Sequence, residues 1–228
     1  MDNNSKVLKL KTKSSIIQLF IAICGTFVAV FGLFMFNQHL LMSFSLPLRM
    51  ILMIVTQWLL FLVPAILMVV YKEKLSCMGF RKEKIPSQIG IGILLAVSMS
   101  LVLTVLPIIL GFKDVVGDYA YTQTWQFAYE FIYRILGVAL AEELVFRGYI
   151  FNKLLQIKNS KWFAIIISSL LFGLFHILNG NIIQVFVTAF IGLVYCIFRE
   201  KIKGCTLLSL IIAHGVYDAL IVLWVSIL

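Results

Sequence analysis

Residues 135–151 read ILGVALAEELVFRGYIF, and this stretch decides what kind of fold the chain adopts. Apart from Glu142, Glu143 and Arg147, every residue in it is apolar or glycine. Ionisable side chains in such a run are costly to bury in a membrane, so they indicate a functional site. The rest of the chain has the same character: 62% of its 228 residues are hydrophobic and 13% are charged. Soluble domains have roughly 45–50% and 25%, so we exclude a soluble enzyme, a disordered tail and a secreted disulfide scaffold.

The apolar runs predict an all-α polytopic membrane protein, a bundle of about seven transmembrane helices. A membrane-spanning helix needs about 20 apolar residues, and each run approaches that length. The first three spans, within residues 1–126, and the last four, within residues 127–228, are expected to form one membrane-embedded unit. The expected spans are Ile16–Phe36, Leu48–Tyr71, Ile89–Phe112, Phe127–Asn152, Trp162–Asn179, Ile182–Phe198 and Thr206–Leu228.

The net charge of +9 comes from lysine and arginine residues that gather in alternate loops. They lie before the first span and after the second, fourth and sixth spans, and Lys153 and Arg199 are interpreted as members of these loops. Alternate loops share one side of the membrane, so the positive-inside rule places the N-terminus in the cytosol and the C-terminus outside. We therefore interpret the basic charge as an orientation signal that attracts anionic lipid, and not as a nucleic-acid site.

Three spans contain ionisable side chains far from their ends. Counted at 1.5 Å per residue from the cytosolic anchors, Glu142 and His214 lie roughly 16 Å deep and His176 roughly 22 Å deep. All three depths fall in the middle of a hydrocarbon core about 30 Å thick. The sequence therefore predicts one buried polar site, built from the fourth, fifth and seventh spans.

Helical spacing suggests how these residues are paired. Glu143 and Arg147 are four residues apart and share a helix face, so we expect an ion pair that leaves Glu142 free for chemistry. By the same spacing Asp218 can orient His214, and Phe172, one turn before His176, can wall that histidine. Glu130 and Arg134 are interpreted as a solvated or interfacial pair near the external end of the fourth span.

Two histidines and a glutamate allow two kinds of hydrolytic chemistry. They can bind one divalent metal such as zinc with an open position for water, the candidate ligands being Glu142, His176 and His214. Alternatively, the glutamate and one histidine polarise a water directly while the other histidine stabilises an oxyanion. The residues leave both alternatives open.

Three motifs occur in order on these helices: Glu-Glu-x-x-x-Arg, Phe-x-x-x-His and His-x-x-x-Asn/Asp. Together they resemble the CPBP family, the CAAX protease and bacteriocin-processing (Abi) group of intramembrane endopeptidases, over about Phe127–Leu220. The type II CAAX prenyl endopeptidases belong to this group, whose members are often labelled metalloproteases.

The resemblance implies a role for each residue. Glu142 would be the general base that activates water, with His176 assisting it, and Glu143 and Arg147 would support the site. His214 and Asp218 would stabilise the oxyanion. The position of Asp218 is often asparagine in the family, and an aspartate donates a hydrogen bond only when it is protonated. A charged Asp218 would instead orient His214.

We therefore expect a bacterial, multi-pass hydrolase of the plasma membrane. Its partners would be the lipid bilayer and a membrane-associated peptide or protein substrate, without nucleic acid. The resemblance implies CAAX-type cleavage, bacteriocin or peptide-signal processing, or self-immunity. The alternative is a non-catalytic scaffold or immunity protein that binds a peptide or a sensor partner. A coupled transporter is a third hypothesis, disfavoured because the sequence lacks internal repeats and paired broken helices.

Overall fold

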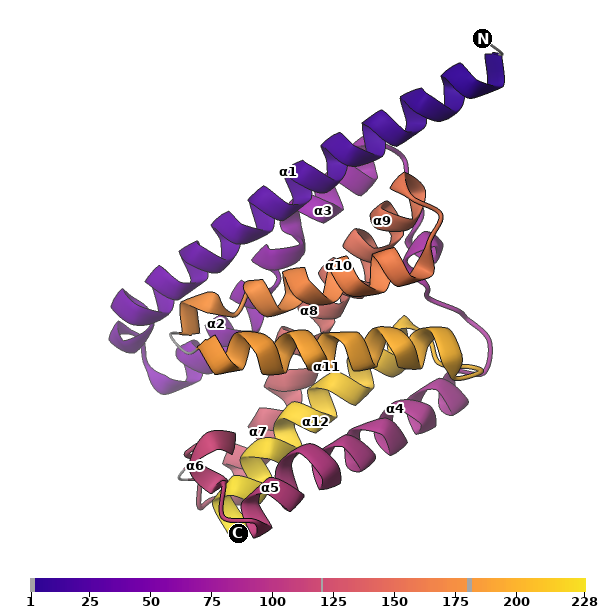
Figure 1. Ribbon diagram of the computed structural model, residues 1–228. Helices are drawn as coiled ribbons and strands as arrows, with labels where there is room; N and C mark the ends of the chain where they lie inside the picture. Colours follow the sequence, from indigo (N-terminus) through magenta and orange to yellow (C-terminus); the bar gives the residue numbers. More distant parts are fainter. Residues whose placement is uncertain (1–2, 120, 180–181) are drawn as a thin grey trace.

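The computed structural model describes residues 3–119, 121–179 and 182–228, and every regular element among them is helical (Figure 1). The chain is an all-α polytopic membrane protein, as the sequence predicts. Five helical stretches among the described residues are long and apolar enough to cross a membrane. These stretches are Leu10–His39, Leu46–Val70, Ile85–Ile109, Ile182–Lys201 and Leu207–Ile227.

The N-terminal half is built from long helices that are interrupted only locally. Helix α1 (Asn3–His39) is a single helix of 37 residues. Helices α2 (Leu46–Gln57) and α3 (Leu59–Val70) meet at Trp58 and together form the second expected span. A 3-10 turn, η2 (Leu75–Met78), precedes α4 (Ile85–Ser100), which continues through the π turn η3 (Leu101–Val105) into α5 (Leu106–Ile109) and is followed by the short α6 (Lys113–Val116).

The fourth expected span is one continuous helical path with two π segments. Right-handed helical dihedrals persist at every junction along this path. The sequence pattern did not indicate these π turns, which are rare and frequently mark functional sites. The parts are α7 (Thr124–Ile132), the π segment η4 (Tyr133–Ala139), α8 (Leu140–Glu143), the π segment η5 (Leu144–Ile150) and α9 (Phe151–Ile157).

The last three elements differ in length. Helix α10 (Lys161–Leu174) has 14 residues and ends in a turn and the 3-10 helix η6 (Ile177–Asn179), so it is shorter than the expected span Trp162–Asn179. Helices α11 (Ile182–Lys201) and α12 (Leu207–Ile227) are both long enough to span. The Thr206 hydroxyl caps the start of α12 by accepting a hydrogen bond from the Ser209 amide.

The helices pack so that the two halves of the chain interlock (Figure 1). Helix α12 lies along α4, α10 lies along α11, and α1 lies against α3 and α9. Glycines permit two of the closest approaches. A Cβ on Gly92 would lie 2.6 Å from the Ser209 carbonyl oxygen, and one on Gly215 would lie 2.6 Å from the Ile135 Cα. Helix α12 is therefore held tightly between α4 and η4.

The Lys153 side chain is more deeply buried than the sequence suggested. Lys153 is 1% exposed, forms an ion pair with Glu73 and lies 2.5 Å from the Gln18 side-chain oxygen. It is therefore a buried link between α1, α9 and the segment after α3, and its interpretation as a loop cation was wrong.

Of the two interpretations of the Glu130–Arg134 pair, solvated or interfacial, the structure contradicts the solvated one for Glu130. Glu130 is 3% exposed and binds the Arg134 Nε at 2.8 Å. The Tyr121 hydroxyl donates to the other Glu130 oxygen at 2.9 Å, and burial together with this bond raises the pKa of Tyr121 to about 12.

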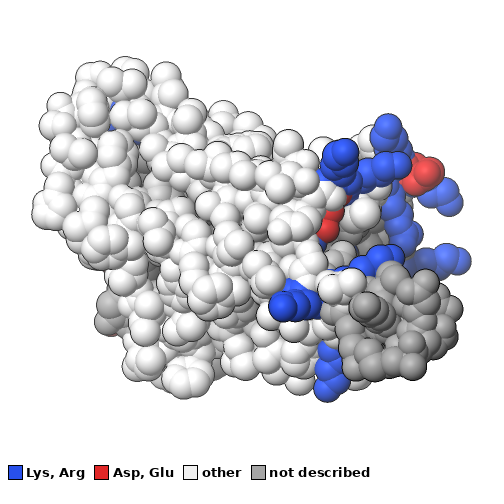
Figure 2. Space-filling view, turned by 90° about the horizontal axis from the view of Figure 1, so that it is seen from above, with Lys and Arg blue, Asp and Glu red and all other residues white. Residues whose placement is uncertain are grey.

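Charged side chains gather at one end of the molecule. Figure 2 shows lysine and arginine residues over the end where α9 and α11 terminate, while the rest of that face is nearly free of charge. At this end Lys161 forms an ion pair with Glu200 at 2.6 Å. The alternate-loop pattern predicts this common basic end.

Candidate active site

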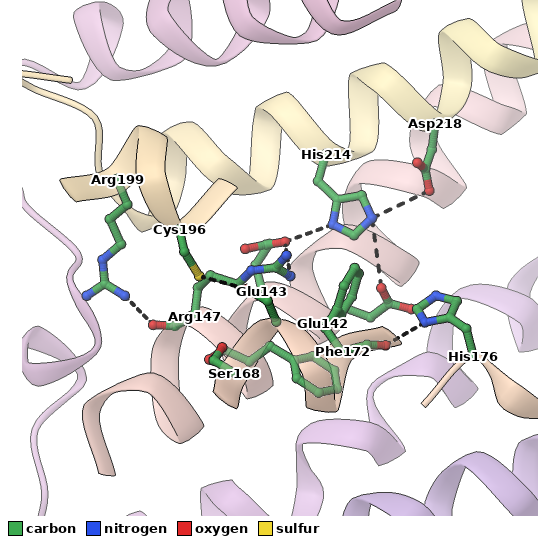
Figure 3. A network of polar contacts seen from close by, with 12 residues as sticks. Glu142, Glu143, Arg147, Ser168, Phe172, His176, Cys196, Arg199, His214 and Asp218 are labelled. Carbon is green, nitrogen blue, oxygen red and sulfur yellow. Dashed lines mark hydrogen bonds and ion pairs between the residues drawn. The ribbon is translucent and has the colours of Figure 1, made fainter. Parts of the chain in front are cut away.

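Three helical paths bring the sequence-predicted residues to one place in the bundle (Figure 3). Glu142 and Glu143 lie in α8, the single α turn between the two π segments, and Arg147 follows in η5. Phe172 lies near the end of α10 and His176 in the turn after it. His214 and Asp218 lie one turn apart on α12.

Glu143 is the centre of the polar network. One oxygen, Oε1, accepts hydrogen bonds from Arg147 Nη1 at 2.8 Å and from His214 Nδ1 at 2.9 Å. The predicted ion pair with Arg147 is present, and both side chains are fully buried. Because a carboxylate only accepts, His214 carries its hydrogen on Nδ1 toward Glu143. Glu143 therefore holds the His214 ring, a role that spacing alone suggested for Asp218.

Arg147 is surrounded by aromatic rings as well as by its carboxylate partner. Its guanidinium carbon lies 4.1 Å from the ring centroid of Phe172 and 5.4 Å from that of Tyr195. Arg147 Nε and Nη2 have no hydrogen-bond partner among the described residues. Both rings lie within the range of cation–π attraction, which partly replaces those hydrogen bonds.

The other side of the His214 ring faces two more carboxylates. His214 Nε2 lies 3.8 Å from Glu142 Oε2 and 3.6 Å from Asp218 Oδ2, both beyond direct hydrogen-bond distance. The Glu142 and Asp218 side chains are 13% and 21% exposed, whereas the Glu143 side chain is fully buried. This side of the ring is therefore the less buried one.

His176 and His214 have different hydrogen-bond partners at Nδ1. The His176 Nδ1 lies 2.8 Å from the Phe172 carbonyl oxygen, which only accepts, so Nδ1 carries a hydrogen toward that oxygen. The Phe172 ring packs edge-on against His176 at 4.9 Å and against His214 at 5.9 Å. Phe172 thus walls both histidines and also orients one of them through its backbone.

The placement of the candidate ligands shows whether they are gathered around a position for a divalent metal. Among residues 3–119, 121–179 and 182–228, no group of three or more His, Cys, Asp or Glu side chains is arranged to hold a metal ion. Of the candidate ligands Glu142, His176 and His214, both histidines have Nδ1 on an oxygen acceptor, so Nε2 is the nitrogen that each would offer to a metal. The described side chains are therefore not gathered into a three-ligand cradle.

The sequence motifs missed two residues of α11 that contact the network. The Tyr195 ring centroid lies 5.5 Å from that of His214, and Arg199 donates a hydrogen bond to the Arg147 carbonyl. Arg199 had been interpreted as a loop charge, which the structure corrects. The only sequence signal is the spacing of Gly192, Tyr195, Cys196 and Arg199, which places these four residues on one helix face.

Fold and site together define a class: a polytopic all-α membrane protein with a glutamate–histidine–arginine network buried in its helix bundle. Residues 124–220 match the family model of type II CAAX prenyl endopeptidase Rce1-like proteins, a stretch that includes every residue named in the network of this site. This stretch is therefore similar to the CAAX protease family, the family that the three motifs predicted. The match covers less than half of the chain and leaves α1 to α6 outside it. No curated protein and no solved structure matches the chain.

Proposed function

We propose that this protein is an intramembrane endopeptidase that hydrolyses a peptide bond of a membrane-associated substrate with water activated by Glu142. One observation carries the proposal. Glu142, a partly accessible carboxylate, lies 3.8 Å from the Nε2 of His214, an imidazole whose other nitrogen is fixed by a buried ion pair. A base beside a fixed, oriented donor is the arrangement that acyl-transfer chemistry requires.

In the proposed reaction Glu142 takes a proton from water while the water oxygen bonds to the carbonyl carbon of the substrate. The lone pair on His176 Nε2 accepts the second water hydrogen and so orients the water. The tetrahedral oxyanion then collapses, the C–N bond breaks, and Glu142 returns its proton to the departing nitrogen. The products are a carboxylic acid and an amine, and Glu142 is regenerated.

His214 is the proposed oxyanion donor. Around its ring lie the carboxylates of Glu142, Glu143 and Asp218, against which Arg147 supplies one positive charge and Arg134, which interacts electrostatically with Asp218, supplies a second. A second proton on His214 Nε2 would improve this charge balance and give an N–H that points at the developing oxyanion.

Asp218 acts on His214 rather than on the substrate in this proposal. Its oxygen lies 3.6 Å from His214 Nε2, and a charged carboxylate has no hydrogen to give to an oxyanion. Its negative charge instead stabilises the protonated ring.

The charge pattern and the family similarity support a proposal for the orientation, the location and the substrate class of the protein. We propose that the basic end faces the cytosol, that the N-terminus lies on that side, and that the enzyme resides in a bacterial plasma membrane. CAAX-type cleavage is the proposed substrate setting that the matched family model supports, and bacteriocin or peptide-signal processing and self-immunity are the other proposed settings. In each of these settings the bilayer provides apolar surroundings. The reaction that they share is hydrolysis of a peptide bond that reaches the middle of the membrane.

The test compares wild type, Glu142→Gln and Glu83→Gln in detergent on a peptide library with and without prenyl groups, read by mass spectrometry. Glu83 is exposed in the loop before α4 and is the matched control. We expect cleavage by wild type and by Glu83→Gln, none by Glu142→Gln, and equal thermal stability. Failure of wild type to cleave, with Glu142→Gln still active in cells, would support a non-catalytic scaffold. Loss of cleavage on adding a chelator, with rescue by zinc, would overturn metal-free water activation.

A further inference from the structure

Helix α11 contains none of the three motifs, yet it lies against α10 and beside α12 (Figure 1). Its buried residues are Gly192, Tyr195 and Cys196, and Arg199 continues the same face one turn later. The opposite face carries Phe186 and other apolar residues that are exposed on the outside of the bundle. One face of α11 is therefore directed at the site, while the other suits lipid.

Tyr195 restrains the plane of the His214 ring. Its side chain is 0% exposed, and the two ring centroids lie 5.5 Å apart at an interplanar angle of 32°. The bond from His214 Nδ1 to Glu143 and the edge contact with Phe172 leave the ring some freedom to tilt. An aromatic face packed beside the imidazole removes this freedom and also attracts the ring when it is charged.

Arg199 restrains the backbone from which Arg147 projects. It donates a hydrogen bond to the Arg147 carbonyl inside the π segment η5, and its guanidinium carbon lies 4.8 Å from the Phe151 ring centroid. A Cβ on Gly79, a residue with φ of +95°, would come within 2.6 Å of Arg199 Nη2. Arg199 is thus held between η5 and the loop after α3, and it stabilises a wide turn that backbone bonds alone hold less regularly.

Gly192 sets the distance between α11 and the site. A Cβ there would meet Phe172 Cδ1 at 3.1 Å and Arg147 Nη2 at 3.2 Å, so even one methyl group would press on both side chains. The helix therefore approaches the network as closely as side chains permit.

We propose that this face of α11 is the positioning surface of the active site: Tyr195 holds the His214 ring, and Arg199 holds the turn that presents Arg147 to Glu143. The inference rests on the proposed function and adds two positioning residues that no motif contains. Neither residue touches the substrate in this proposal. Both act through the Arg147–Glu143–His214 chain of contacts.

The first test replaces Tyr195 by Phe and by Leu, with Phe190→Leu on the exposed face of α11 as the matched control. Tyr195→Leu should lower kcat about tenfold or more with little change in KM, because small misplacements at a reacting centre are costly. Tyr195→Phe keeps the ring and should retain most of the activity, as should Phe190→Leu. Wild-type kcat in a folded Tyr195→Leu variant would overturn the role of Tyr195.

The second test reads His214 directly by ¹⁵N imidazole spectroscopy. The chain has three histidines, so the His214 signals can be assigned with His39→Gln and His176→Gln variants. Tyr195→Leu and Arg199→Gln should shift or broaden the Nδ1–H signal, while Arg199→Lys, which keeps a donor, should restore it in part. Unchanged His214 signals in folded Tyr195→Leu and Arg199→Gln variants would overturn the proposal.

The spectroscopic test separates this inference from the proposed function. The His214 signal requires no cleavage, so its response to Tyr195→Leu would support the positioning role even if no peptide were cut. Cleavage that persists with an unresponsive signal would overturn the inference alone. Should Tyr195→Leu fail to fold, the Arg199→Gln and Arg199→Lys pair decides the outcome.

Discussion

At the scale of single residues, the site is organised by one buried ion pair. Glu143 and Arg147 are both 0% exposed, and a single Glu143 oxygen serves the guanidinium and His214 together. The sequence could predict the pair because four residues of helix separate its members. It could not predict that His214 binds Glu143, because the two residues are 71 positions apart. Only the crossing of α12 past α8 brings them together.

Removing Arg147 alone should therefore lower the free energy of unfolding more than removing both members of the pair. Arg147→Met removes the guanidinium that pairs with the buried Glu143 carboxylate, and removing one partner of a buried ion pair typically costs about 3–5 kcal/mol. The double variant Glu143→Leu/Arg147→Met removes both charges and should recover part of that loss. Unfolding of the purified proteins in detergent measures both quantities. Equal stability of the single and double variants would contradict the expectation.

Histidine and aspartate on α12 should differ in their effect on catalysis. His214→Ala removes the proposed oxyanion donor and should lower kcat by about 10²–10³. Asp218→Asn should lower it by less than about tenfold, because an amide at this place can donate to the oxyanion itself. Steady-state cleavage by the two variants gives the comparison. A larger loss for Asp218→Asn than for His214→Ala would refute the assigned roles.

At the scale of elements, two π segments and two close helix contacts shape the site. The apolar runs predicted where the helices lie, because hydrophobicity over about 20 residues is a property of the chain itself. The π segments on either side of Glu142 and Glu143 left no pattern in hydrophobicity, since their dihedrals remain helical. The approach of α12 to η4 depends on Gly215, whose purpose only the packing reveals.

Gly215→Ala should disturb both stability and activity. Its Cβ would lie 2.6 Å from the Ile135 Cα and 2.9 Å from the Ile135 nitrogen, so backbone must move, at a cost of about 1–3 kcal/mol. The shift would displace the adjacent His214 and reduce cleavage. Gly90→Ala on α4, where nothing lies within 4 Å, is the control. It should stabilise by about 0.5–1 kcal/mol because alanine favours a helix. Equal melting temperatures and equal cleavage rates for Gly215→Ala and Gly90→Ala would contradict this expectation.

At the scale of the whole molecule, charge and apolar surface divide the protein into a basic end and a lipid-facing body (Figure 2). The loops that follow α3, α9 and α11 carry much of the positive charge, and the proposed orientation places them in the cytosol. The proposed orientation of the helices across the membrane rests on this uneven distribution of charge.

Cysteine labelling can test the orientation. Cys77 is exposed in η2, in the loop between α3 and α4, and should react with a membrane-impermeant maleimide in inside-out vesicles but not in intact cells. The experiment uses a Cys24→Ser/Cys196→Ser background. Labelling of Cys77 from outside the cell would reverse the proposed orientation.

Cys205 should stay unlabelled at neutral pH in the same experiment. It is buried in the turn before α12, and burial raises the pKa of its thiol to about 11. The thiol is therefore protonated at pH 7, and the reactive thiolate increases only as the pH rises toward that value. Rapid labelling of Cys205 at pH 7 in folded protein would contradict this. A Cys205→Ser variant provides the background signal.

The sequence by itself determined the membrane class, most of the helices, the three motifs and the similarity of residues 124–220 to the CAAX protease family. These are encoded in the order of residues along the chain, in apolar length and in spacing within single helices. The tertiary structure alone decided the partner of His214, the second support from Tyr195 and Arg199, and the burial of Lys153 and Glu130. Those features depend on contacts between helices distant in sequence, and hydrophobic runs specify that helices pack without specifying which faces meet.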